Sequence, residues 1–88
     1  MSWSVEFTKA ARKDIRALDP VVRKRIEGAI RSKLVIDPKA HLAPLSGELR
    51  GLGKFRVGPY RLICKLEEDR LLILVLKLGA RGSVYRKR

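Results

Sequence analysis

The sequence contains one cysteine, Cys64, and one histidine, His41, among its 88 residues. A single cysteine excludes an internal disulfide framework, and the two residues together exclude a zinc site built from Cys and His alone. Cys64 alternates in phase with Leu62 and Leu66, which is typical of a thiol in the core. The adjacent carboxylates at positions 67–69 cannot easily converge on one ion, so we expect neither a metal nor another cofactor.

Long apolar stretches are also absent. The longest, from Leu71 to Leu76, has six residues, whereas a membrane-spanning helix needs about 18 or more. The residues before Phe7 lack the apolar segment of a signal peptide. We therefore expect a cytoplasmic protein without a membrane partner.

Acidic residues are scarce. Nine Asp and Glu face 21 Lys and Arg, which gives a net charge of +12 and a pI near 10.8. Such an excess repels itself in a compact protein, and polyanions relieve it because Lys and Arg release condensed counterions from phosphates. The composition indicates binding to nucleic acid or to the ribosome, and a solvated basic surface without a specific partner is the alternative.

The length fits a single domain over residues 1–88, and the hydrophobic content of 45% suits a folded globule. From Trp3 to Phe7, apolar residues alternate with polar ones, as in a half-buried strand. Thr8 can then cap a first helix, and Asp19-Pro20 is typical of the start of a second, which should end near Asp37. The two helices carry apolar stripes, made of Ala11, Ile15 and Leu18 in the first and of Val22, Ile26, Ala29, Ile30 and Leu34 in the second.

The rest of the chain predicts strands. Residues 39–53 look irregular, and strands are expected near 54–58, 60–67 and 70–78, with Gly58-Pro59 as a tight turn. The order is therefore an N-terminal strand, two helices and a three-stranded antiparallel meander. It predicts an α+β fold in which the helices pack on one sheet.

Basic residues converge in the first hairpin of the meander. Lys54 and Arg56 share one face of their strand, and a two-residue turn at Gly58-Pro59 places Arg56 opposite Arg61. Directly opposed like charges are unfavourable, so the cluster indicates a bound anion such as a phosphate, with three solvated charges as the alternative. The second hairpin loop is ambiguous by one residue, and a three-residue loop would add Lys77 to this face.

Three segments resemble the RelE/ParE toxin superfamily: KFRVGPYRL at 54–62, LGAR at 78–81 and VYR at 84–86. The resemblance extends over nearly the whole chain. The glycine-x-tyrosine-arginine motif that ends at Arg61 is fairly specific for the superfamily. Arg81, followed by Tyr85 four residues later, favours its ribonuclease branch.

The resemblance implies a RelE-like toxin of a type II toxin–antitoxin system. Toxins of this branch are mRNA interferases, which enter the ribosomal A site and cut the exposed codon. They need no metal, because the 2′-hydroxyl of the RNA is the nucleophile and a 2′,3′-cyclic phosphate is left. The implied partners are a small acidic antitoxin, the ribosome and mRNA.

The resemblance also implies residue roles. Lys54 and Arg56 open the hairpin motif, Arg61 holds the scissile phosphate, Arg81 assists the leaving 5′-oxygen and Tyr85 stacks on a codon base. Lys77 and Arg86 complete the expected RNA-binding set. Arg56 stands where the best-known members carry a lysine thought to act as base, and guanidinium is a very poor proton acceptor, so Lys54 is the better candidate. Ala80 stands where many relatives have His or Lys.

Other interpretations stay open. A ParE-like toxin would share the fold and the hairpin motif but would inhibit DNA gyrase and cleave nothing. The joint presence of Lys54, Arg81 and Tyr85 favours the nuclease, although Tyr85 alone could simply cover the edge of the core. Arg56 and Ala80 also allow a degenerate toxin that only binds its antitoxin.

Overall fold

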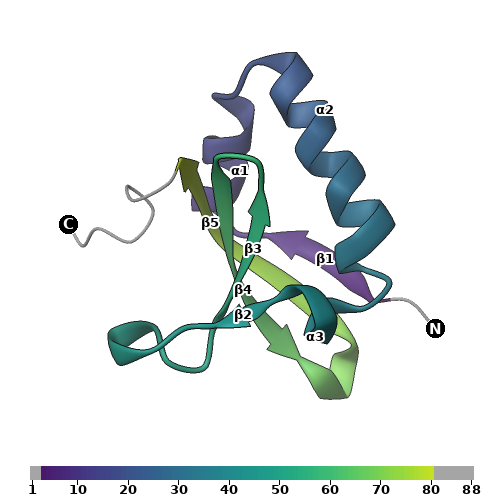
Figure 1. The fold of residues 1–88 in the computed structure, drawn as a ribbon, viewed down its shortest axis with the longest axis vertical. Helices are drawn as coiled ribbons and strands as arrows, with labels where there is room; N and C mark the ends of the chain where they lie inside the picture. Colours follow the sequence, from purple (N-terminus) through teal and green to yellow (C-terminus); the bar gives the residue numbers. More distant parts are fainter. Residues whose placement is uncertain (1–2, 81–88) are drawn as a thin grey trace.

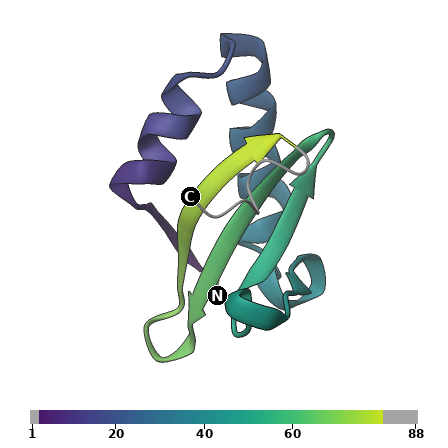
Figure 2. The same cartoon turned by 90° about the vertical axis from the view of Figure 1, so that its left-hand side faces the viewer.

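The computed structural model describes residues 3–80, which form one five-stranded sheet with helices against one of its faces (Figures 1 and 2). The strands are β1 (Ser4–Phe7), β2 (Ala43–Pro44), β3 (Gly53–Val57), β4 (Tyr60–Glu67) and β5 (Leu72–Ala80). The helices are α1 (Lys9–Arg16), α2 (Pro20–Ala29), a π-helical turn (Ile30–Leu34) and α3 (Pro38–His41), with 3-10 turns at Gly47–Leu49 and Glu68–Arg70. The predicted α+β class is confirmed.

The sheet joins the two ends of the described chain. Its strand order is β1-β5-β4-β3-β2, so the first strand lies beside the last. β1 runs parallel to β5, with Val5 paired to Ile73 and Phe7 to Val75, whereas β3, β4 and β5 form the predicted antiparallel meander. The sequence pattern predicted the strand β1 but not its neighbour in the sheet.

The helices begin as their sequences predict. Thr8 caps α1, and its Oγ1 accepts a hydrogen bond of 3.1 Å from the backbone N of Ala11. Pro20 occupies the first turn of α2, where its missing N–H is not needed. The helical chain continues through the π-helical turn to Leu34, somewhat short of the expected end near Asp37. No helix within residues 3–80 is long and apolar enough to cross a membrane.

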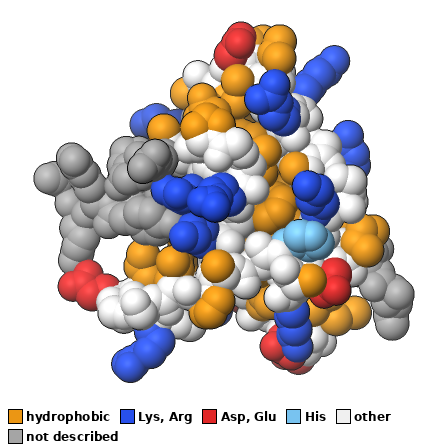
Figure 3. Space-filling view, viewed as in Figure 1, with side chains coloured by type: hydrophobic (Ala, Val, Ile, Leu, Met, Phe, Trp, Pro, Cys, Tyr) orange, Lys and Arg blue, Asp and Glu red, His pale blue; other side chains and the backbone are white. Residues whose placement is uncertain are grey.

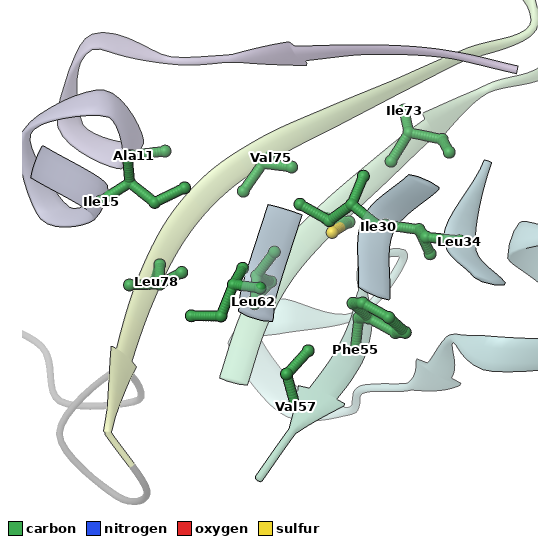
Figure 4. Packing of buried hydrophobic residues seen from close by; sticks show 12 residues of the cluster. Ala11, Ile15, Ile30, Leu34, Phe55, Val57, Leu62, Ile73, Val75 and Leu78 are labelled. Atoms are coloured by element: carbon green, nitrogen blue, oxygen red, sulfur yellow. The ribbon is translucent and has the colours of Figure 1, made fainter. Parts of the chain in front are cut away.

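The core lies between the helices and one face of the sheet (Figure 4). Both predicted apolar stripes point into it, with Ala11 and Ile26 fully buried. The sheet contributes Phe55, Val57, Leu62, Cys64, Ile73, Val75 and Leu78. Each large aliphatic side chain contributes roughly 1.5–3 kcal/mol by leaving water, so this layer supplies most of the stabilisation of a small domain.

The segment from 39 to 53 was predicted to be irregular and instead contains α3 and β2. Ala43 pairs with Lys54 and Pro44 with Gly53, and β2 is an edge strand, where proline is tolerated. Gly53 is required there by space, since a Cβ would lie 2.9 Å from Leu42 Cβ. These contacts place β2 beside β3 and extend the sheet by one strand.

Candidate functional site

The face of the sheet that the helices leave open carries the basic residues of the hairpin. Arg56 pairs with Arg61, and Lys54 pairs with Ile63, so the predicted placement of the three basic residues on one face is confirmed. Figure 2 shows α2 behind the strands and α1 beside them, at the left, and in Figure 3 Lys and Arg side chains gather over β3, β4 and β5. We call Lys54, Arg56, Arg61 and Lys77 the basic face.

A tight turn sets the register of this hairpin. Val57 pairs with Tyr60, which leaves Gly58 and Pro59 as the two turn residues. Gly58 has a φ of 58°, a value that suits glycine, and Pro59 can follow it because a type II′ turn returns to negative φ at the second position. Directly opposed side chains have Cβ atoms about 5 Å apart, so the side chains of Arg56 and Arg61 leave the sheet next to each other.

A β-bulge brings Lys77 to the same face. The loop between β4 and β5 has four residues, 68–71, because Glu67 pairs with Leu72. The register then shifts: Cys64 pairs with Val75 but Ile63 pairs with Lys77, so Leu76 is an extra residue in β5. One extra residue exchanges the two faces of the strand beyond it. The three-residue loop on which the prediction depended is therefore absent, yet Lys77 lies on the basic face.

The basic face combines exposed and half-buried cations around an apolar residue. Arg56 and Lys77 are exposed, whereas Lys54 and Arg61 are half-buried. Ile63, only 3% exposed, pairs with Lys54 on one side and with Lys77 on the other. Salt screens the attraction of an anion by partly buried charges less than its attraction by exposed ones, so this arrangement is suited to an anion.

Three of the four cations of the basic face make no ion pair with a described acidic side chain. Among residues 3–80, Lys39 and Glu68 form an ion pair at 3.1 Å and Arg70 and Glu67 form one at 2.9 Å, and neither contains a residue of the basic face. Lys54, Arg56 and Lys77 make no ion pair within the described chain. Their charge is available to an external anion, and several converging N–H donors suit the oxygen atoms of a phosphate.

The comparison with known families identifies the chain. Residues 5–85 match the family described as the ParE toxin of type II toxin–antitoxin systems, parDE. The chain belongs to this family. The matched range contains the hairpin motif and extends over Arg81 and Tyr85, and the predicted membership of the RelE/ParE superfamily is confirmed.

Relatives of this ParE-family toxin carry RelE-type names. The toxin RelG of Mycobacterium tuberculosis is 29% identical over 87 residues, which cover 99% of this chain and all of the relative. The toxin–antitoxin complex RelBE2 of the same organism contains a chain that is 27% identical, with a TM-score of 0.86 over 92% of this chain and 100% of that one. The intact E. coli RelBE complex matches at 20% identity and a TM-score of 0.73, over 98% and 99% of the two chains, which shows the shared fold.

Three predicted site residues, Arg81, Tyr85 and Arg86, lie outside the described residues. The strand that leads towards them ends at Ala80, which pairs with Tyr60. Their roles in the toxin therefore stay predictions from the sequence. Within residues 3–80, the structure brings together all the predicted members of the site, namely Lys54, Arg56, Arg61 and Lys77.

The single residue Lys65 and a cluster on α1 are further basic features that were not among the predicted site residues. Lys65 is exposed and alternates with Arg61 and Ile63 along β4, so it extends the open face, and the simple alternation of the strand could have identified it. On the other layer of the toxin, Lys9, Arg12, Lys13 and Arg16 line a shallow hollow along α1. All four are exposed, which makes this a second basic surface.

The remaining candidates are structural. Burial raises the pKa of the Cys64 thiol to about 12, which keeps the thiol protonated and unreactive at neutral pH. His41 is exposed, with Nδ1 3.0 Å from the carbonyl of Asp37 and its ring edge-on to Phe55. No group of His, Cys, Asp and Glu within residues 3–80 is arranged to hold a metal ion.

Proposed function

We propose that this toxin is a ribosome-dependent mRNA endonuclease that cuts codons in the ribosomal A site. The observation that carries the proposal is the convergence of Lys54, Arg56, Arg61 and Lys77 on one open face of the sheet. A phosphodiester under attack gains negative charge, and converging cations are suited to stabilise it. The RelE-type names of the relatives favour the same branch, and the proposed substrate places the toxin in the cytoplasm.

The proposed reaction uses the 2′-hydroxyl of the RNA as its nucleophile. The 2′-oxygen loses its proton and bonds to the adjacent phosphorus, the bond from phosphorus to the 5′-oxygen breaks, and a 2′,3′-cyclic phosphate is left. The proton of the 2′-hydroxyl passes to the base, and the 5′-oxygen takes up a proton from water as it leaves. In this scheme Arg61 and Lys77 bind the phosphate, Arg81 assists the leaving oxygen, and Tyr85 and Arg86 bind the codon beside it.

The proton acceptor in this scheme is Lys54. Arg56 is a very poor acceptor, because guanidinium stays protonated under physiological conditions. Lys54 is half-buried and pairs with the buried Ile63. Of the two residues that open the hairpin motif, Lys54 carries the side chain whose neutral form can accept a proton, which leaves electrostatic stabilisation to Arg56.

A cognate antitoxin is part of the proposal. Relatives of known structure were solved as complexes of toxin and antitoxin, among them RelBE2 of Mycobacterium tuberculosis and RelBE of E. coli. For this toxin we propose a small acidic antitoxin with a disordered segment that folds on binding. Such a segment can cover a large surface, and an acidic one neutralises the basic face.

The second candidate function is the inhibition of DNA gyrase without nuclease activity. The matched family is described by the name ParE, whose members share the fold and the hairpin motif. Such a toxin would use the same open face for a different partner. It would not require the convergence of basic groups that nuclease chemistry needs.

Primer extension on a message translated by purified ribosomes separates the two functions. We expect new 5′ ends within A-site codons when the toxin is added, and none when Arg61→Ala is added. A parallel reaction contains gyrase and supercoiled DNA, and no linear DNA should appear in it. An intact message together with gyrase-linearised DNA would instead establish the second function.

A further inference from the structure

The strand β5 loses its outer neighbour half-way along its length. β1 pairs with residues Leu72–Val75 and ends at Phe7. Beyond Val75, the edge of β5 on that side has no paired strand among the described residues. Lys77 lies in this second half of β5, and so does the bulge at Leu76.

Where β1 ends, residues at the start of α1 provide the hydrogen-bond partners for the outer edge of β5. Thr8 N donates to the carbonyl of Val75 at 3.0 Å, and Thr8 Oγ1 donates to the carbonyl of Leu76 at 2.8 Å. Nearly two turns further along α1, Asp14 Oδ2 accepts a hydrogen bond of 3.0 Å from the backbone N of Leu78. Backbone groups that are withdrawn from water need such partners, and here helix side chains supply them instead of a strand.

These hydrogen bonds bracket Lys77. The carbonyl of Leu76 and the N–H of Leu78 both point to the outer edge of β5, while Lys77 between them belongs to the ladder with β4. If Leu76 instead paired with Ile63 and the ladder stayed regular, Lys77 would turn to the face that the helices cover. The hold of α1 on Leu76 and Leu78 therefore stabilises the register in which Lys77 reaches the basic face.

We propose that Thr8 and Asp14 are positioning residues of the toxin. They hold the bulged end of β5 and so keep Lys77 on the basic face, in register with Ile63. Neither residue needs to touch RNA. The effect of these two residues on RNA cleavage rests on the proposed function, whereas their hydrogen bonds to β5 do not depend on it.

The effect of the hydrogen bond between Asp14 and Leu78 has to be separated from the effect of the negative charge of Asp14. Asp14 and Lys77 both line the groove between α1 and the end of β5, so the carboxylate also lies near the cations. Asp14→Asn removes the charge but keeps an oxygen that can accept from Leu78 N, and Asp14→Ala removes both. For Thr8, Thr8→Ser keeps the hydroxyl, and Thr8→Val removes it at nearly constant volume.

A double-mutant cycle with Lys77→Ala tests the proposal by single-turnover cleavage on programmed ribosomes. We expect Asp14→Asn to stay within about twofold of the wild type and Asp14→Ala to be about tenfold slower, since small misplacements of catalytic groups are costly. When Lys77→Ala is already present, adding Asp14→Ala should lower the cleavage rate by less than about twofold. Both changes remove the same contribution of Lys77, so their effects should not add. Additive losses, or equal losses in Asp14→Asn and Asp14→Ala, would overturn the proposal.

Amide hydrogen exchange gives a readout that does not depend on RNA. We expect the Leu78 amide to exchange about tenfold or more faster in Asp14→Ala than in Asp14→Asn, while the paired amides of β1 keep their protection. Unchanged protection of Leu78 would overturn the proposal whatever the toxin does to a message. Faster exchange of Leu78 in a protein whose wild type cuts no message would support the hold on β5 and refute the nuclease function alone.

Discussion

The two faces of the central hairpin have opposite chemistry although they alternate along the same strands. On β4, Arg61 is half-buried on the basic face, while its neighbour Leu62 is completely buried under the helices. On β3, Arg56 is exposed and its neighbour Phe55 is buried. The comparison predicts that stability and activity are separable in this toxin, because adjacent residues serve the core on one side and the proposed anion site on the other.

The covered face should give the largest effect. Leu62→Ala leaves a cavity at a fully buried position, and we expect the free energy of unfolding to fall by about 2–5 kcal/mol. Urea denaturation followed by circular dichroism measures it. The fraction that remains folded should still cut RNA at the wild-type rate, and a loss of cleavage in fully folded Leu62→Ala would contradict the separation of the two faces.

The adjacent position on the open face should show the reverse. Arg61→Ala removes the proposed donor to the scissile phosphate, and we expect single-turnover cleavage to fall about 100-fold or more. Thermal unfolding should remain cooperative, as a check that the variant folds. Arg16→Ala on the exposed surface of α1 is a matched control, and a loss of similar size there would mean that total charge matters rather than position.

A smaller effect should distinguish the roles of two cations on the open face. If Lys54 accepts the 2′-hydroxyl proton, cleavage by the wild type rises with pH, because only a neutral amine can accept a proton. The rise should flatten in Lys54→Ala and persist in Arg56→Lys, which keeps a cation at the neighbouring position. The pH dependence of the single-turnover rate measures this, and equal slopes in the wild type and Lys54→Ala would leave Lys54 with phosphate binding alone.

The smallest effect should come from the covered face at alkaline pH. Burial raises the pKa of the Cys64 thiol from 9.0 to about 12, so between these values the unfolded chain loses a proton that the folded toxin retains. The contribution of this thiol to the free energy of unfolding is complete below pH 9 and decreases above it, by about 1 kcal/mol at pH 10. Cys64→Ala lacks this contribution. Urea unfolding of both proteins at pH 8 and 10 should therefore show a larger loss in the wild type, and equal losses would contradict it.

Local patterns predicted much of this fold and part of the candidate site. Alternation along the strands and the Gly58-Pro59 turn were sufficient to place Arg56 opposite Arg61, because a tight turn fixes the register of its own hairpin. The helix stripes and the cap at Thr8 follow from similarly local periods and hydrogen bonds. In each case the interacting residues lie close together in the sequence.

The position of Lys77 could not be predicted in this way. It depends on the bulge at Leu76 and on the hydrogen bonds of β5 with Thr8 and Asp14, which lie more than sixty residues earlier. The pairing of β1 with β5 is equally remote. The sequence by itself determined the elements, their buried sides and the first hairpin, since these depend on neighbours along the chain. Only the tertiary structure decided which edge β1 would occupy and which face Lys77 would reach, because both depend on partners that meet only when the chain is folded.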